Sequence, residues 1–166
     1  MEKTTRALAL ASLGVLWLAG AVIPATGVGD DIRRTTDRLL QGASSGSGDV
    51  HAALRHVLEI AAGLGREARL PATVQAKLDT ASAQAQRLSP LDGAVRAAAA
   101  EAYTALNQGG AFAFPKEVGS IDQAKAHGRV QVDRALAAVS AGRPQEAARE
   151  LVGLVLLVIT PMEAKS

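Results

Sequence analysis

The feature that most constrains the fold is a regular spacing of apolar residues that begins after Asp49. Between positions 50 and 68 these residues recur at alternating intervals of four and three, which places them along one face of an α-helix. This apolar stripe consists of Val50, Leu54, Val57, Ala61, Leu64 and Ala68. Similar stripes follow at 74–88 (Val74, Leu78, Ala81, Ala85, Leu88), at 91–105 (Leu91, Val95, Ala98, Ala102, Ala105) and at 128–139 (Gly128, Val132, Ala135, Val139). Each predicted helix therefore has one face to bury.

Helix-breaking and helix-capping residues separate the stripes. Pro71 suits the first turn of the second helix, and Ser89 followed by Pro90 predicts an N-cap for the third. Gly109 and Gly110 end that helix, and Ser120 with Gln123 resembles a capping box. A last helix is expected from Pro144. Because most of the connections are short, sequential helices should run antiparallel.

The composition favours helices over a sheet. Aromatic residues make up only 2% of the chain, so the core is built from Ala, Leu and Val, and Ala-rich faces suit close helix packing. Residues 49–166 are thus predicted to form an all-α domain. Its expected architecture is an up-and-down antiparallel bundle of four to five helices.

The N-terminal residues 1–27 are typical of an export signal. Lys3 and Arg6 precede an uncharged run from Ala7 to Val28, and small residues offer cleavage sites near Ala21 or Gly27. The alternative is an uncleaved anchor, since the run is long enough to span a bilayer, and only then is membrane contact expected. The predicted location is periplasmic or secreted.

A short helix and a flexible linker are expected between the signal and the bundle, over residues 28–48. The helix should open at Asp30 and Asp31, whose charges suit a helix N-terminus, and "QGASSGSG" has the composition of a flexible loop. The chain has no cysteine, which excludes disulfides and thiolate metal sites.

The nine residues "LVGLVLLVI", 151–159, carry no polar side chain. As a helix they would rise only about 14 Å, under half of a bilayer core of about 30 Å. A strand is the alternative, since four of these residues are β-branched, but the sequence offers no second strand to pair with it. We therefore predict one helix from Pro144 to about Ile159, stopped by Pro161 and Glu163. Its second half is apolar on every side, so it must be enclosed by its own bundle, by a partner chain or by lipid. Leu154 and Leu157 are therefore candidate partner contacts.

The loop "GGAFAFPKEVG" holds both phenylalanines of the chain, Phe112 and Phe114, and Tyr103 lies two helical turns earlier. Either the loop plugs one end of the bundle with its two rings, or these aromatic residues grip a ligand or partner.

Motifs for catalysis are missing from the sequence. It has no Gly-x-Ser-x-Gly elbow and no cysteine nucleophile, so no catalytic residue and no cofactor is predicted. His56 and Glu59 are three residues apart and could share a metal, but neither copy of the Glu-x-x-His pattern of di-iron proteins is present. The net charge of +2, without a long basic run, gives no support to nucleic acid binding.

Three functions follow as hypotheses. The first is a non-enzymatic binding or scaffolding protein of the cell envelope, acting through a protein partner or as a homo-oligomer. The second is a periplasmic carrier of a small apolar ligand, with its pocket near Phe112 and Phe114. The third is a metal-binding protein that uses His56 and Glu59.

Overall fold

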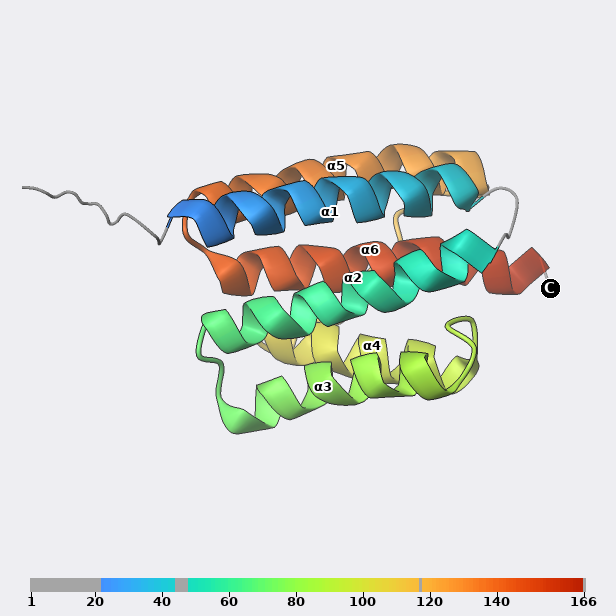
Figure 1. Cartoon of the computed structure of the whole chain (residues 1–166). Coiled ribbons are helices and arrows are strands. Elements are labelled where there is room, and N and C mark those ends of the chain that lie inside the picture. Colours follow the sequence, from blue (N-terminus) through green and yellow to red (C-terminus); the bar gives the residue numbers. More distant parts are fainter. Residues whose placement is uncertain (1–21, 44–47, 117, 166) are drawn as a thin grey trace, which may run out of the picture. The chain divides into compact units, whose positions relative to one another are not determined.

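The computed structural model describes residues 22–43, 48–116 and 118–165, and these residues form six α-helices and no strand. The helices are α1 (Val22–Gly42), α2 (Gly48–Glu67), α3 (Ala72–Arg87), α4 (Gly93–Leu106), α5 (Ile121–Ser140) and α6 (Pro144–Lys165) (Figure 1). The all-α prediction is confirmed. Most of the predicted signal peptide and the centre of the predicted linker, residues 1–21 and 44–47, lie outside the described residues, so both remain predictions.

The chain divides into two units, with the boundary between Asp31 and Ile32. In the first unit, the described residues 22–31 are helical and form the beginning of α1. This helix is 21 residues long and begins at Val22, eight residues before the predicted start at Asp30. Pro24, Gly27 and Gly29 are poor helix formers, which is why the sequence pattern does not reveal this first part.

Within the second unit, four helices close a ring. The contacting pairs are α2 with α3, α3 with α4, α4 with α6, and α6 with α2 (Figure 1). Helix α5 contacts α6 from outside the ring. The stripes predicted for α2 and α3 point into this core, as the burial of Leu54, Val57, Leu78 and Ala85 shows.

Helix α6 is shared between the ring and the helices beyond it, which explains its apolar run. It contacts α2, α4 and α5, and Leu40 of α1 also reaches the place where Gly128 of α5 meets Leu154 of α6. All nine residues from Leu151 to Ile159 are buried. The run is therefore core, enclosed on every side by helices of its own chain.

Helix α6 does not stop at Pro161 as predicted, but continues to Lys165. Pro161 has no N–H to donate to the helix ladder, whereas the Thr160 hydroxyl adds a bond of 2.8 Å to the carbonyl oxygen of Leu156. The helix continues because Pro161 removes only one hydrogen bond, while the buried residues before it are held by packing. Within the described residues, none of the helices combines the length and apolar character that crossing a bilayer requires.

The predicted N-cap of α4 is wrong by three residues. Ser89 belongs to a turn, and the N-cap is Asp92, whose Oδ1 accepts a hydrogen bond of 2.8 Å from the N–H of Ala94. For α5 the predicted cap is confirmed. The hydroxyl of Ser120 accepts a bond from the N–H of Gln123, and Oε1 of Gln123 accepts one from the N–H of Gly119.

A tight turn joins α5 to α6. Gly142 adopts a φ of 73°, a left-handed conformation that favours glycine, and the N–H of Arg143 reaches back to the carbonyl oxygen of Ala138. Because the turn is so short, the two helices lie side by side and run in opposite directions. This hairpin fixes which residues of α5 face which residues of α6.

Candidate ligand-binding site

The aromatic loop between α4 and α5 folds against the helices. Asn107 caps the end of α4, and its Nδ2 donates to the carbonyl oxygen of Gly110 at 3.2 Å. Phe112 and Phe114 are half-buried and pack against a core cluster formed by Val118, Ala124 and Leu157. The loop thus covers the α5–α6 hairpin with its two rings.

Tyr103 and Phe112 form an aromatic pair. Their ring centroids are 5.4 Å apart and their planes meet at 88°, the edge-to-face arrangement that aromatic rings prefer. Tyr103 comes from α4 and Phe112 from the loop. The pair therefore ties the loop to the bundle.

A cavity of about 390 Å³ opens beside this pair, between α4, the loop, α5 and α6. We call it the Tyr103 cavity. It is lined by Tyr103 and Asn107, by Ala111, Phe112, Ala113 and Pro115 of the loop, by His127, Val130, Gln131 and Arg134 of α5, and by Glu150 and Leu157 of α6. The volume lies within the range of small-ligand pockets, and the lining combines apolar walls with a few polar groups.

Gly153 of α6 makes room for the wall of this cavity. A β-carbon at Gly153 would stand 2.7 Å from Nε2 of Gln131, 3.2 Å from the Tyr103 ring and 3.7 Å from the Phe112 ring. Contacts under 3.0 Å are not tolerated without movement. The bare backbone at this position therefore allows the Gln131 amide and both rings to pack directly on α6.

The Gln131 amide is incompletely satisfied. Its Oε1 is buried and receives no hydrogen bond from any described residue. A buried acceptor without a partner costs about 1–3 kcal/mol. Because the oxygen itself is not accessible, a ligand in the cavity would recover this energy only after the amide had turned toward it.

Glu150 and Arg134 bring charge to the cavity. Glu150 is the one charged residue in the buried class among the described positions, and Arg149 Nη2 pairs with its Oε2 at 3.1 Å. Arg134 is exposed and makes no hydrogen bond or ion pair with the described part of the chain. The cavity therefore offers the Glu150 carboxylate, whose charge is partly neutralised by Arg149, and the Arg134 guanidinium, which has no ion-pair partner among the described residues.

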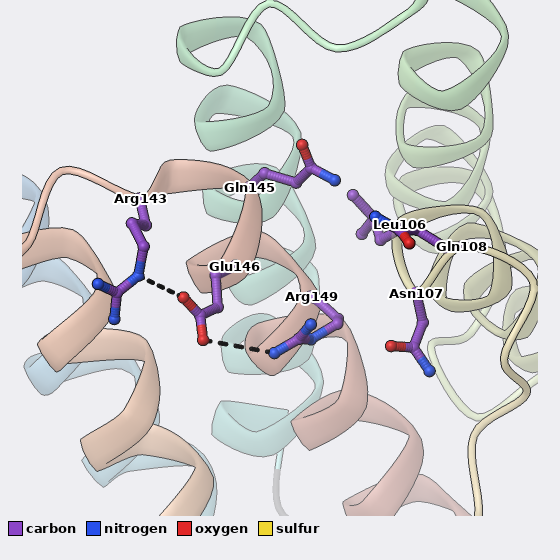
Figure 2. A pocket seen from close by; sticks show the side chains of 7 residues that line it. All are labelled: Leu106, Asn107, Gln108, Arg143, Gln145, Glu146 and Arg149. Carbon is purple, nitrogen blue, oxygen red and sulfur yellow. Dashed lines mark hydrogen bonds and ion pairs between the residues drawn. The ribbon is translucent and has the colours of Figure 1, made fainter.

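A second hollow, of about 370 Å³, lies next to this site, between the end of α4 and the start of α6. Figure 2 shows Arg143 and Arg149 on either side of Glu146, across from Asn107 and Gln108. Glu146 forms ion pairs with both arginines. Since each cation already has a carboxylate partner, this hollow lacks the unpaired charge that distinguishes the Tyr103 cavity.

The residues predicted from the sequence fall into three groups. Tyr103 and Phe112 meet and line the cavity, as does Leu157, whereas Phe114 packs with Phe112 against the core cluster without lining the cavity. Leu154 and Leu157 are buried, at 0% and 1% exposed. A protein partner could reach Leu154 only if α6 separated from its neighbours, and Leu157 offers only the small area that lines the cavity, so their role as partner contacts remains a prediction.

His56 and Glu59 do lie together, far along the chain from this cavity. His56 Nδ1 and Glu59 Oε1 are 3.0 Å apart on the surface, and Glu59 also accepts a hydrogen bond from Gln86. Within the described residues, no group of three or more His, Cys, Asp or Glu side chains is placed to hold a metal ion.

Gln131, Arg134, Glu150 and Gly153 were not predicted as site residues. One signal in the sequence could have found them. The short turn after Ser140 sets an antiparallel register, which places Gln131 opposite the single glycine of the apolar run. Comparison of the chain with protein-family models, curated protein sequences and solved structures found no match.

Proposed function

We propose that the chain is an exported, non-enzymatic binding protein that holds a small ligand in the Tyr103 cavity. The packing of Gln131 against Gly153 carries this proposal. A glycine inside a helix costs about 0.5–1 kcal/mol relative to alanine, and the unpartnered Gln131 oxygen costs more. Gln75 beside Gly65 also has a buried oxygen without a partner, but the pair at Gln131 and Gly153 adjoins the Tyr103 cavity, and stability given up beside a cavity is typical of a functional site.

The cavity also has the construction of a ligand site. The Tyr103–Phe112 pair and Leu157 supply an apolar wall, and Gln131, Glu150 and Arg134 supply polar groups around it. Apolar walls with a few placed polar groups provide affinity and orientation, respectively. These side chains come from three helices and a loop, so the bundle itself positions them.

The scaffolding role inferred from the sequence has less support. Its predicted contact surface, the run from Leu151 to Ile159, is buried within the chain. We therefore assign the binding role to the Tyr103 cavity and not to the end of α6. The signal peptide, the periplasmic or secreted location and the up-and-down antiparallel order of the helices belong to this same proposal.

Mass spectrometry of the exported protein, purified without denaturation, tests the proposal. We expect a small molecule to be released when the protein is unfolded. Phe112→Ala should lose this molecule, because Phe112 lines the cavity and pairs with Tyr103.

Phe114→Ala is the matched control. It removes the same ring from the same loop and the same core cluster, but Phe114 does not line the cavity. It should retain the ligand. The proposal is overturned if the wild-type protein releases nothing and no small molecule in a screening library raises its melting temperature.

A further inference from the structure

The register of the α5–α6 hairpin places the two charged groups of the Tyr103 cavity at one level. Gln131 meets Gly153, and the two helices run in opposite directions. Arg134 lies three residues after Gln131, and Glu150 lies three residues before Gly153. Each therefore lies about one helical turn from the Gln131–Gly153 contact, on the side nearer the connection between α5 and α6.

Arg134 and Glu150 nevertheless form no ion pair with each other. Glu150 pairs with Arg149, and Arg134 has no charged partner in the described part of the chain. Both residues line the cavity. A cation and an anion that face one cavity without meeting leave a space that a ligand of mixed charge would bridge.

The next level of the cavity has a different character. There the buried Oε1 of Gln131 needs a hydrogen-bond donor, and the Tyr103 and Phe112 rings present apolar surface. Arg134 and Glu150 therefore mark a charged end, whereas the aromatic pair, Leu157 and Pro115 present apolar surface at the other end, where His127 also lines the cavity. The volume of about 390 Å³ holds roughly a dozen groups of the size of water.

We propose, building on the binding function proposed above, that the ligand is a free amino acid with an apolar side chain. Its carboxylate binds the Arg134 guanidinium, which presents paired N–H donors suited to that group. Its ammonium group donates to Glu150 and, after a small rotation of the amide, to Oε1 of Gln131. Its side chain lies against Tyr103 and Phe112.

A ligand with only one charge fits less well. A simple amine would leave Arg134 unpaired and would enter a cavity that already has Arg149 beside Glu150. A simple carboxylate would leave the Gln131 oxygen without a donor and would lie next to the Glu150 carboxylate. The zwitterion satisfies both ends at once.

Isothermal titration calorimetry with three matched probes tests this inference. The probes are L-phenylalanine, 2-phenylethylamine and 3-phenylpropanoate, which share one ring and differ in charge; L-leucine tests an aliphatic side chain. We expect an amino acid to bind at least about tenfold more tightly than either singly charged analogue, because each analogue loses a charge-assisted contact.

Arg134→Gln is the informative variant. Arg134 is exposed and has no partner among the described residues, so its replacement should leave the fold intact. It should weaken amino acid binding about tenfold without weakening 2-phenylethylamine binding, because the loss of a nearby positive charge can only favour a cationic amine. Arg87→Gln, at an exposed position at the end of α3, is the control and should change neither.

The outcomes separate this inference from the function on which it rests. Tighter binding of an analogue than of both amino acids, or a released ligand of another chemistry that Phe112→Ala loses, overturns the inference and leaves the binding function standing. No binding by any probe, together with an empty mass spectrum and no stabilising molecule in the library, overturns both.

Discussion

A β-carbon placed on Gly128 would stand 3.0 Å from Cδ1 of Leu154, and equally close to Cδ2 of Leu40. Three helices, α1, α5 and α6, thus meet where α5 has no side chain. The space that a glycine leaves here is filled by two leucines that are both buried. The glycine is required by packing, since its backbone is helical.

We therefore expect Gly128→Ala to destabilise the protein. Alanine gains about 1 kcal/mol in helix propensity, but overpacking of a closed core costs about 1–3 kcal/mol. The net loss in the free energy of unfolding should be about 1 kcal/mol. Urea denaturation monitored by circular dichroism measures it.

Gly63→Ala provides the matched control. Gly63 lies inside α2, is exposed, and has nothing within 4 Å of the position of a β-carbon. This change should raise the free energy of unfolding by about 1 kcal/mol. If both variants shifted stability in the same direction, the close contact at Gly128 would not be limiting.

Leu154→Ala tests whether the apolar run of α6 is core. Leu154 is fully buried, so its truncation should lower the free energy of unfolding by about 2–5 kcal/mol. Val130→Ala, at a position that is 49% exposed, should change it by less than about 0.5 kcal/mol. Light scattering should give the same molar mass for both variants as for the wild-type protein. If Leu154→Ala instead had a lower molar mass and unchanged stability, Leu154 would contact a partner chain.

The helices and much of their packing could be predicted from the sequence, because apolar spacing directly reports which face of a helix is buried. The stripe at 50–68 is an example, since Val50, Leu54 and Val57 are all fully buried. Where all faces of a helix are buried, the spacing of its apolar residues does not show which neighbours cover them. The sequence of the run 151–159 therefore left open what covers it, and only the contacts of α6 with α2, α4 and α5 show that helices of the same chain do.

The site could be predicted only in part, for a different reason. Tyr103 and Phe112 stand out because aromatic residues are rare in this chain. Gln131, Arg134 and Glu150 are ordinary polar residues of amphipathic helices, and their importance comes from the hairpin register that brings them to one cavity. Composition cannot reveal a relationship of that kind.

The start of α4 offers a test at the level of single hydrogen bonds. Asp92 accepts a bond from the N–H of Ala94, so Asp92→Ala should lower the free energy of unfolding by about 1 kcal/mol. The side chain of Ser89, three residues earlier, accepts a longer bond of 3.3 Å, from the N–H of Leu91 in the preceding turn. Thermal unfolding of both variants measures this, and Ser89→Ala should lower the free energy of unfolding by less than half as much as Asp92→Ala. If Ser89→Ala had the larger effect, Ser89 would be the N-cap.

Gly153→Ala should separate ligand binding from stability. The new β-carbon would stand 2.7 Å from Nε2 of Gln131, so the amide must move toward the cavity, while the Tyr103 ring at 3.2 Å has to yield slightly. The gain in helix propensity of about 1 kcal/mol offsets much of this strain, so we expect a change in unfolding free energy below about 1 kcal/mol. Calorimetric affinity for the bound small molecule should nevertheless fall about tenfold, the effect of losing about 1.4 kcal/mol. Gly63→Ala, on a helix that does not line the cavity, should leave the affinity unchanged. Equal affinities for the wild-type protein and Gly153→Ala would show that the position of the Gln131 amide does not matter for binding.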